Sequence, residues 1–186
     1  MNVLPPADLP VRLTRFFGRR TETTELAWMV DRVTLLTLVG APGCGKTRLG
    51  VELGALVEPR FRDSVRFVAL GSLADPALVA SAVAVACGVQ ERPGERIEDT
   101  LVEALTGAEL LLVLDNCEHV VDAAADLARR LVVTCPRAHV LATSRVALGL
   151  PGEQVCQVPP LEIASAIELF TDRASLASHD FPVDGT

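Results

Sequence analysis

The segment from Gly40 to Thr47 contains residue types that together can hold a phosphate group. It reads Gly40-Ala41-Pro42-Gly43-Cys44-Gly45-Lys46-Thr47 and matches the pattern G-x-x-x-x-G-K-[ST] in full. We expect backbone N–H groups of this loop and of the helix that follows to point at a β-phosphate. Lys46 would add positive charge at the β- and γ-phosphate oxygens, and Thr47 would offer a hydroxyl to Mg²⁺. The alternative is a chance glycine-rich turn, which the flanking apolar strand and helix disfavour.

A second acidic position completes the predicted metal site. Five consecutive apolar residues, 110–114, end in Asp115, as expected for a buried strand whose carboxyl end carries a functional aspartate. Thr47 and Asp115 are therefore the candidate metal ligands, and Lys46 and Asp115 the central catalytic candidates. The alternative is that Asp115 merely begins a loop.

The residues after Asp115 differ from those of many hydrolytic P-loop ATPases, which place a carboxylate directly next to this aspartate. Here the neighbour is Asn116, which cannot accept a proton as a carboxylate can. Glu118 is the candidate for positioning water, against the alternative of a solvated loop charge. His119 is interpreted as a surface residue or a helix start.

An arginine follows the next apolar run, 139–142. The run continues through Thr143 and Ser144 to Arg145, which we expect near the γ-phosphate, where its guanidinium would distinguish ATP from ADP. The alternative is a loop arginine that makes weak surface pairs. Cys44 lies inside the phosphate loop and is interpreted as a tolerated small side chain or, alternatively, as an oxidation-sensitive thiol.

Hydrophobic periodicity predicts the elements that must position these residues. Strands are predicted over residues 33–39, 65–70, 110–114, 138–142 and 155–158, and helices over 21–31, 47–57, 76–87, 97–105, 120–133 and 163–177. Thr21 and Asp75 are predicted N-caps. The alternation predicts an α/β fold, a three-layer αβα P-loop sandwich with a mostly parallel five-stranded sheet. We expect the subclass with an additional central strand and the strand order 5-1-4-3-2.

These segments resemble a known family, the STAND ATPases (signal-transduction ATPases with numerous domains). The resemblance rests on F-F-G-R-R at 16–20, G-A-P-G-C-G-K-T-R-L at 40–49, L-L-L-V-L-D-N-C-E-H-V at 110–120, V-L-A-T-S-R-V-A-L-G-L-P-G-E at 140–153, V-P-P-L at 158–161 and A-I-E-L-F-T-D-R-A at 166–174. It extends over about residues 13–177. The chain is most similar to the NB-ARC-like module of bacterial LuxR-type and AfsR-type transcriptional regulators.

The resemblance implies an ADP/ATP switch whose slow hydrolysis resets a regulator. It implies that Gly18 and Arg19 pack beside the adenine and ribose, and that Arg145 is the sensor arginine. With these two residues, the candidate nucleotide-binding positions are Gly40, Ala41, Pro42, Gly43, Cys44, Gly45, Lys46, Thr47 and Arg48. Arg20 departs from the glutamate that the family more often has. The family continues with a winged helix, helical repeats and often a DNA-binding helix-turn-helix, which are not visible in these 186 residues.

Composition limits the other classes of function. The net charge of −7 does not favour direct contact with nucleic acid, so we expect DNA to be reached only through another domain. The five cysteines lack metal or disulfide spacing and are interpreted as reduced thiols of a cytoplasmic protein. No apolar run is long enough to cross a membrane. We expect residues 1–15 to be an extended leader, 16–178 the nucleotide-binding domain and 179–186 a frayed tail.

The sequence therefore predicts a regulatory module that binds ATP or ADP with Mg²⁺, with other regulator domains as partners and ATP-dependent oligomers possible. Two alternatives remain open, a working ATPase of AAA-like type and an inactive truncated scaffold. The first would require a carboxylate after Asp115, where Asn116 stands, and the intact Lys46 and Thr47 disfavour the second. GTP is a weaker ligand candidate because the base-reading pattern N-K-x-D does not occur.

Overall fold

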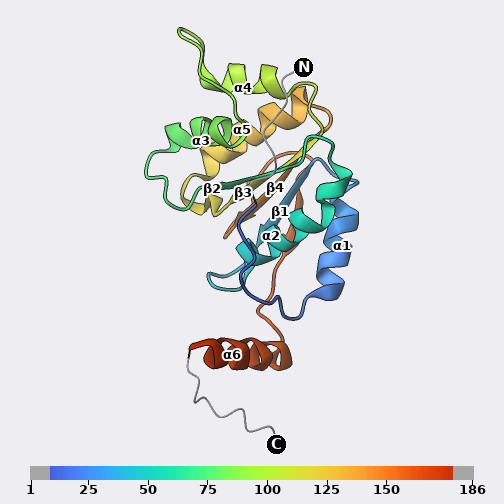
Figure 1. The fold of residues 1–186 in the computed structure, drawn as a ribbon. Coiled ribbons are helices and arrows are strands. Elements are labelled where there is room, and N and C mark those ends of the chain that lie inside the picture. Colours follow the sequence, from blue (N-terminus) through green and yellow to red (C-terminus); the bar gives the residue numbers. More distant parts are fainter. Residues whose placement is uncertain (1–8, 178–186) are drawn as a thin grey trace, which may run out of the picture.

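A five-stranded sheet forms the centre of the molecule in the computed structural model, which describes residues 9–177 (Figure 1). The strands are β1 (Leu35–Val39), β2 (Val65–Ala69), β3 (Leu110–Asp115), β4 (Ala138–Ser144) and β5 (Gln154–Gln157). Their order is β2-β3-β4-β1-β5, and every neighbouring pair is parallel. This confirms the predicted α/β P-loop fold and its strand order.

Helices cover both faces of this sheet. Figure 1 shows α1 (Arg20–Val30) and α2 (Lys46–Val57) on one face, with α3 (Val79–Ala86), α4 (Ile97–Leu105) and α5 (Val121–Thr134) on the other. Short 3₁₀ turns occupy Glu58–Arg60, Pro76–Leu78 and Cys117–His119. The last described helix, α6 (Ile163–Ala177), lies apart from both layers and has no buried residue. Within residues 9–177, no helix combines the length and hydropathy that a bilayer span requires.

The uniformly apolar β3 explains why two cores form. All six of its residues are buried, and alternate side chains point to opposite faces. Leu110, Leu112 and Leu114 pack in the cluster beneath α3, α4 and α5, whereas Leu111 and Val113 pack in the cluster beneath α1 and α2. A central strand covered on both faces needs apolar residues throughout, as the sequence predicted.

Two glycines bring α2 close to the sheet. A Cβ on Gly50 would lie 3.4 Å from the Thr143 methyl, and one on Gly54 would lie 3.4 Å from Val65. Both distances lie at the limit between a tight and an ordinary van der Waals contact, so a residue with a larger side chain at either position would press against the sheet. The two glycines therefore allow α2 to pack closely against the sheet.

Several predicted boundaries were wrong by a few residues. The first helix begins at Arg20, and its N-cap is Arg19 in the left-handed region (φ 59°) rather than Thr21. The predicted helix 76–87 divides into a 3₁₀ turn and α3, although Asp75 caps the turn by accepting from the Ala77 N–H. The run predicted as 120–133 begins at Val121, after the 3₁₀ turn. The predicted tail, 179–186, lies outside the described residues.

Candidate functional site

The parallel sheet brings the predicted site residues to one edge. All five strands end there, and the register pairs Val39 of β1 with Ser144 of β4. Gly40 and Arg145 therefore leave neighbouring strand ends at the same level. On the other side of β4, Leu114 pairs with Ala142, which sets Asp115 level with Thr143. The sheet thus presents the loop, the aspartate and the arginine side by side.

The glycines of the phosphate loop are required for two different reasons. A Cβ at Gly40 would lie 2.7 Å from the Val158 carbonyl oxygen and 2.9 Å from Cys44 Sγ, so the loop has no room for one. Gly43 (φ 75°) and Gly45 (φ 92°) have open space around them but adopt the left-handed region, which only glycine enters without strain. The loop conformation therefore depends on all three glycines.

Lys46 is a buried cation whose partners are neutral. Lys46 is only 8% exposed, and its Nζ donates to the carbonyl oxygens of Gly40 (2.9 Å) and Ala41 (3.1 Å). The ion pairs formed by residues 9–177 do not include it, and it is the only lysine of the chain. A buried ammonium without a carboxylate is electrostatically suited to an anionic ligand.

Asp115 connects the phosphate loop to β4. Its Oδ2 accepts from Thr47 Oγ1 at 3.1 Å, and its Oδ1 accepts from Thr143 Oγ1 at 2.6 Å. The Thr143 hydroxyl also accepts from the Asn116 N–H at 2.9 Å, so the carboxylate has one orientation. The Thr47 hydroxyl and this carboxylate are the hard oxygen donors that Mg²⁺ prefers. The pair fits a magnesium ion, which would bind through Thr47 and Asp115.

Cys117 lies between the two acidic residues of this segment, Asp115 and Glu118. Burial raises the pKa of the Cys117 thiol to about 12, and the two neighbouring negative charges add to the effect. Its Sγ donates to the Leu114 carbonyl at 3.4 Å. The raised pKa keeps the thiol protonated in the native protein at neutral pH.

The Cys117 thiol should make stability pH-dependent in the alkaline range. Below pH 9.0, which is the ordinary pKa of a cysteine thiol, Cys117 is protonated in both the native and the unfolded state. Above this pH the unfolded chain releases a proton that the native state keeps. The free energy of unfolding should therefore fall as the pH rises from about 9 towards 12, more steeply in the parent than in Cys117→Ala. Chemical denaturation at several pH values would measure both slopes, and parallel curves would contradict the prediction.

Glu118 and Arg145 form an ion pair with each other. Arg145 Nε donates to Glu118 Oε1 at 3.0 Å, and the two side chains are 58% and 14% exposed. Asn116 adopts the left-handed region (φ 66°), which asparagine tolerates better than most residues. The His119 ring contacts the Leu70 carbonyl oxygen through Nε2 at 3.0 Å, away from the phosphate loop residues.

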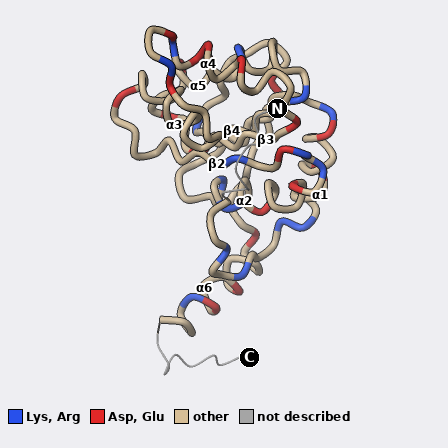
Figure 2. The backbone as a smooth tube through the Cα atoms, turned by 45° about the horizontal axis from the view of Figure 1, so that its top comes forward, with Lys and Arg blue, Asp and Glu red and all other residues tan. Residues whose placement is uncertain are grey.

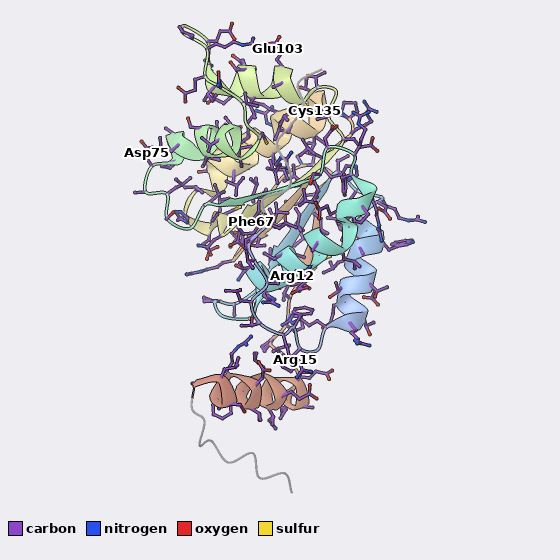
Figure 3. All side chains as sticks on the ribbon, in the orientation of Figure 1. Arg12, Arg15, Phe67, Asp75, Glu103 and Cys135 are labelled. Atoms are coloured by element: carbon purple, nitrogen blue, oxygen red, sulfur yellow. The ribbon has the colours of Figure 1, made fainter. Side chains whose placement is uncertain are left out.

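A cavity of about 520 Å³ opens onto these residues. Lys46, Thr47, Asn116, Glu118 and Arg145 line it, together with Pro10, Val11, Arg12, Pro42, Gly43, Gly45, Arg48 and Val51. The described part of the N-terminal segment forms one wall, and Figure 3 shows Arg12 against α2. Glu52 holds this wall by pairing with Arg12 (3.1 Å) and Arg48 (2.7 Å). Positive side chains outnumber negative ones in this lining, although acidic and basic residues are interspersed over the chain (Figure 2).

A second cavity, of about 460 Å³, adjoins the other side of the phosphate loop. It lies between Phe16 and Phe17, Cys44, and the α6 residues Leu169 and Arg173. Figure 3 shows Arg15 reaching from the N-terminal segment towards α6. Its lining combines aromatic and aliphatic side chains with four arginines, so it can bury a flat apolar group attached to a phosphate chain.

Gly18 packs against α6, and Arg19 lines the second cavity. Gly18 has φ 63°, and a Cβ there would lie 2.8 Å from Ser165 Oγ on α6. Arg19 is 8% exposed, and its guanidinium donates to the carbonyl oxygens of Cys44 (2.8 Å) and Pro159 (2.6 Å). Arg19 thus connects the phosphate loop to the segment that leads into α6.

Sequence analysis did not identify three groups of residues as part of the site. Thr143 was seen only as a small hydroxyl residue, because its bond to Asp115 depends on the β3–β4 register. The N-terminal wall and the α6 lining were missed because long-range packing alone brings them to the loop. A hydroxyl at the end of an apolar strand, next to the predicted arginine, was the available signal for Thr143.

The fold is similar to that of several solved structures. Cdc6p from Pyrobaculum aerophilum superimposes with a TM-score of 0.62 at 19% identity, covering 91% of this chain and 52% of that one. ORC2 of Aeropyrum pernix, solved as ADPNP and ADP complexes, gives 0.65 at 16% identity, covering 89% and 52%. A STAND protein of Pyrococcus horikoshii with a tetratricopeptide repeat sensor gives 0.60 at 17% identity, covering 91% and 27%. At these identities the likeness shows the fold alone.

Curated relatives are closer in sequence and longer. An uncharacterized protein of Mycobacterium tuberculosis is 39% identical over 173 residues, which are 92% of this chain and 44% of that protein. A second M. tuberculosis protein, whose name proposes an HTH-type transcriptional regulator, is 40% identical over 150 residues, which are 80% of this chain and 17% of that protein. The chain thus spans less than half the length of these relatives. The family model described as "AAA domain" matches residues 30–148, well over half of the sequence, and this chain belongs to that family.

Proposed function

We propose that this chain is a nucleotide-dependent regulatory module that binds ATP or ADP with Mg²⁺ and hydrolyses ATP slowly at most. The observation that carries the proposal is the buried Lys46 ammonium, paired only with loop carbonyls and lining one cavity with Thr47. Asp115 holds the Thr47 hydroxyl and completes an anion-and-metal site. The structural neighbour ORC2 of Aeropyrum pernix, solved as ADPNP and ADP complexes, supports adenine nucleotides as the ligand class.

Slow chemistry follows from the residues beside Asp115. The adjacent Asn116 cannot accept a proton, and the next carboxylate along the chain, Glu118, is paired with Arg145. The Arg145 guanidinium occupies a Glu118 oxygen that would otherwise be available to a water molecule. We therefore assign Glu118 and Arg145 to sensing the terminal phosphate rather than to rapid turnover.

We infer that the module belongs to a longer regulator of the NB-ARC-like, LuxR/AfsR type. The regulator-like name of one relative, and the greater length of both, support this inference. ATP and ADP would favour different arrangements of neighbouring domains, and the second cavity would take the base beside Gly18 and Arg19. DNA would be contacted by another domain, because the acidic chain itself does not favour it.

A working ATPase of AAA type is the second candidate, and membership of the AAA domain family favours it. Titration calorimetry with Mg-ATP and Mg-ADP, followed by measurement of phosphate release, distinguishes the two. A regulatory module should bind both nucleotides and turn over far more slowly than about 1 s⁻¹, the lower end of ordinary enzymes. Turnover within the ordinary range would favour the working ATPase. Absence of binding to either nucleotide would reject both candidate functions.

A further inference from the structure

The ion pair between Glu118 and Arg145 has one anchored member and one exposed member. The Glu118 side chain is 14% exposed, whereas the Arg145 side chain is 58% exposed. The orientation of the Asn116 amide that satisfies its hydrogen bonds places its nitrogen 3.2 and 3.3 Å from the two Glu118 oxygens. Glu118 is thus held from a second side, and the Arg145 guanidinium is the group that can exchange partners.

Arg145 also stands where a terminal phosphate would arrive. It follows Ser144, which pairs with Val39 directly before the phosphate loop, and it lines the same cavity as Lys46 and Thr47. A guanidinium forms charge-assisted, often bidentate bonds with phosphate oxygens. While Nε donates to Glu118, only the two terminal nitrogens of the guanidinium can donate to a phosphate, and the Glu118 carboxylate offsets the positive charge that would attract it.

We infer that Glu118 sets the preference between nucleoside triphosphate and diphosphate by competing with the terminal phosphate for Arg145. This inference rests on the proposed function, because it concerns the same nucleotide site. A terminal phosphate that engages all the donors of Arg145 draws the guanidinium away from Glu118, whereas a diphosphate brings no terminal phosphate to this pair. Glu118 therefore weakens ATP binding relative to ADP binding and keeps the diphosphate state populated.

The effect should be small, because the pair is partly exposed and screened by solvent. Exposed ion pairs of this kind change an equilibrium by up to about fivefold. Glu118→Gln should therefore tighten Mg-ATP binding by about two- to fivefold and leave Mg-ADP binding unchanged. The glutamine keeps the shape of the side chain and an oxygen for Asn116. Competition titrations against a fluorescent ADP analogue would measure both dissociation constants.

A double-mutant comparison tests whether Arg145 is the intermediary. In an Arg145→Gln background, Glu118→Gln should no longer change the ratio of the ADP and ATP dissociation constants. The same gain in ATP affinity with and without Arg145 would show that Glu118 acts on the phosphate by direct repulsion, and would overturn the inference. Melting temperatures of all variants verify that each remains folded.

A charge-matched control separates local from general electrostatics. Glu109→Gln removes one negative charge before β3, at the opposite end of the sheet, and should leave both dissociation constants unchanged. An equal shift in this variant would overturn the inference. If the parent binds both nucleotides and Glu118→Gln leaves the ratio of the ADP and ATP dissociation constants unchanged, the inference fails while the proposed function stands. If the parent binds neither, the proposed function fails and this inference fails with it.

Discussion

Replacing Lys46 with alanine is expected to weaken Mg-ATP and Mg-ADP binding by roughly 30-fold or more, from the loss of at least about 2 kcal/mol. The magnitude follows from burial, because Lys46 is 8% exposed and its ammonium bonds two loop carbonyl oxygens rather than a carboxylate. Removing it would take away the one buried cation among the residues that line the first cavity. Calorimetric titration at fixed Mg²⁺ concentration would measure the change.

A charge-matched control makes the Lys46 result interpretable. Arg137→Ala removes one positive charge directly before β4, at the opposite edge of the sheet, and should bind nucleotide as the parent does. Lys46→Ala should retain most of its thermal stability, because the ammonium bonds only two carbonyls within its own loop. Undiminished affinity in a folded Lys46→Ala variant would reject the site.

The single lysine offers a second readout of the same prediction. Lys46 is the only lysine in the sequence, so it is the only lysine side chain that an amine-selective reagent can modify. Bound nucleotide should slow this modification, as peptide mass spectrometry would show. An unchanged rate of modification at saturating nucleotide would argue against a ligand at the phosphate loop.

Asp115→Asn is expected to lower the affinity of the nucleotide complex for Mg²⁺ by about 10- to 100-fold, the usual result of altering a group that binds or orients a metal ligand. The carboxylate supplies negative charge and also accepts from Thr47 and Thr143. An amide can accept one of these bonds but carries no charge. Affinity for ATP measured with Mg²⁺ and with a chelator should become nearly equal.

Asp126→Asn is the matched control for the metal prediction. Asp126 is an exposed α5 residue that pairs with Arg129, three residues along the helix. The same loss of charge there should leave the Mg²⁺ dependence at its parental value. If Asp115→Asn keeps the full Mg²⁺ dependence, the metal is not held at this strand end.

The central strands and the phosphate loop could be predicted because their signals are local. A buried parallel strand such as β3 must be apolar along its whole length, and the conformation of the phosphate loop requires Gly43 and Gly45 at fixed positions. Element ends were less predictable. Arg19 became the N-cap of α1 because its guanidinium is held by Cys44 and Pro159, which are distant in sequence.

The sequence by itself determined the fold class and the presence of Lys46, Thr47 and Asp115 at the ends of apolar strands, because hydrophobic periodicity and glycine spacing act over a few residues. The strand order was expected from the P-loop subclass that the motif indicates, and the structure confirmed it. Only the tertiary structure decided that Thr143 orients Asp115 and that Glu118 holds Arg145. Such partners depend on strand register and loop packing, where a shift of one residue changes every side-chain contact.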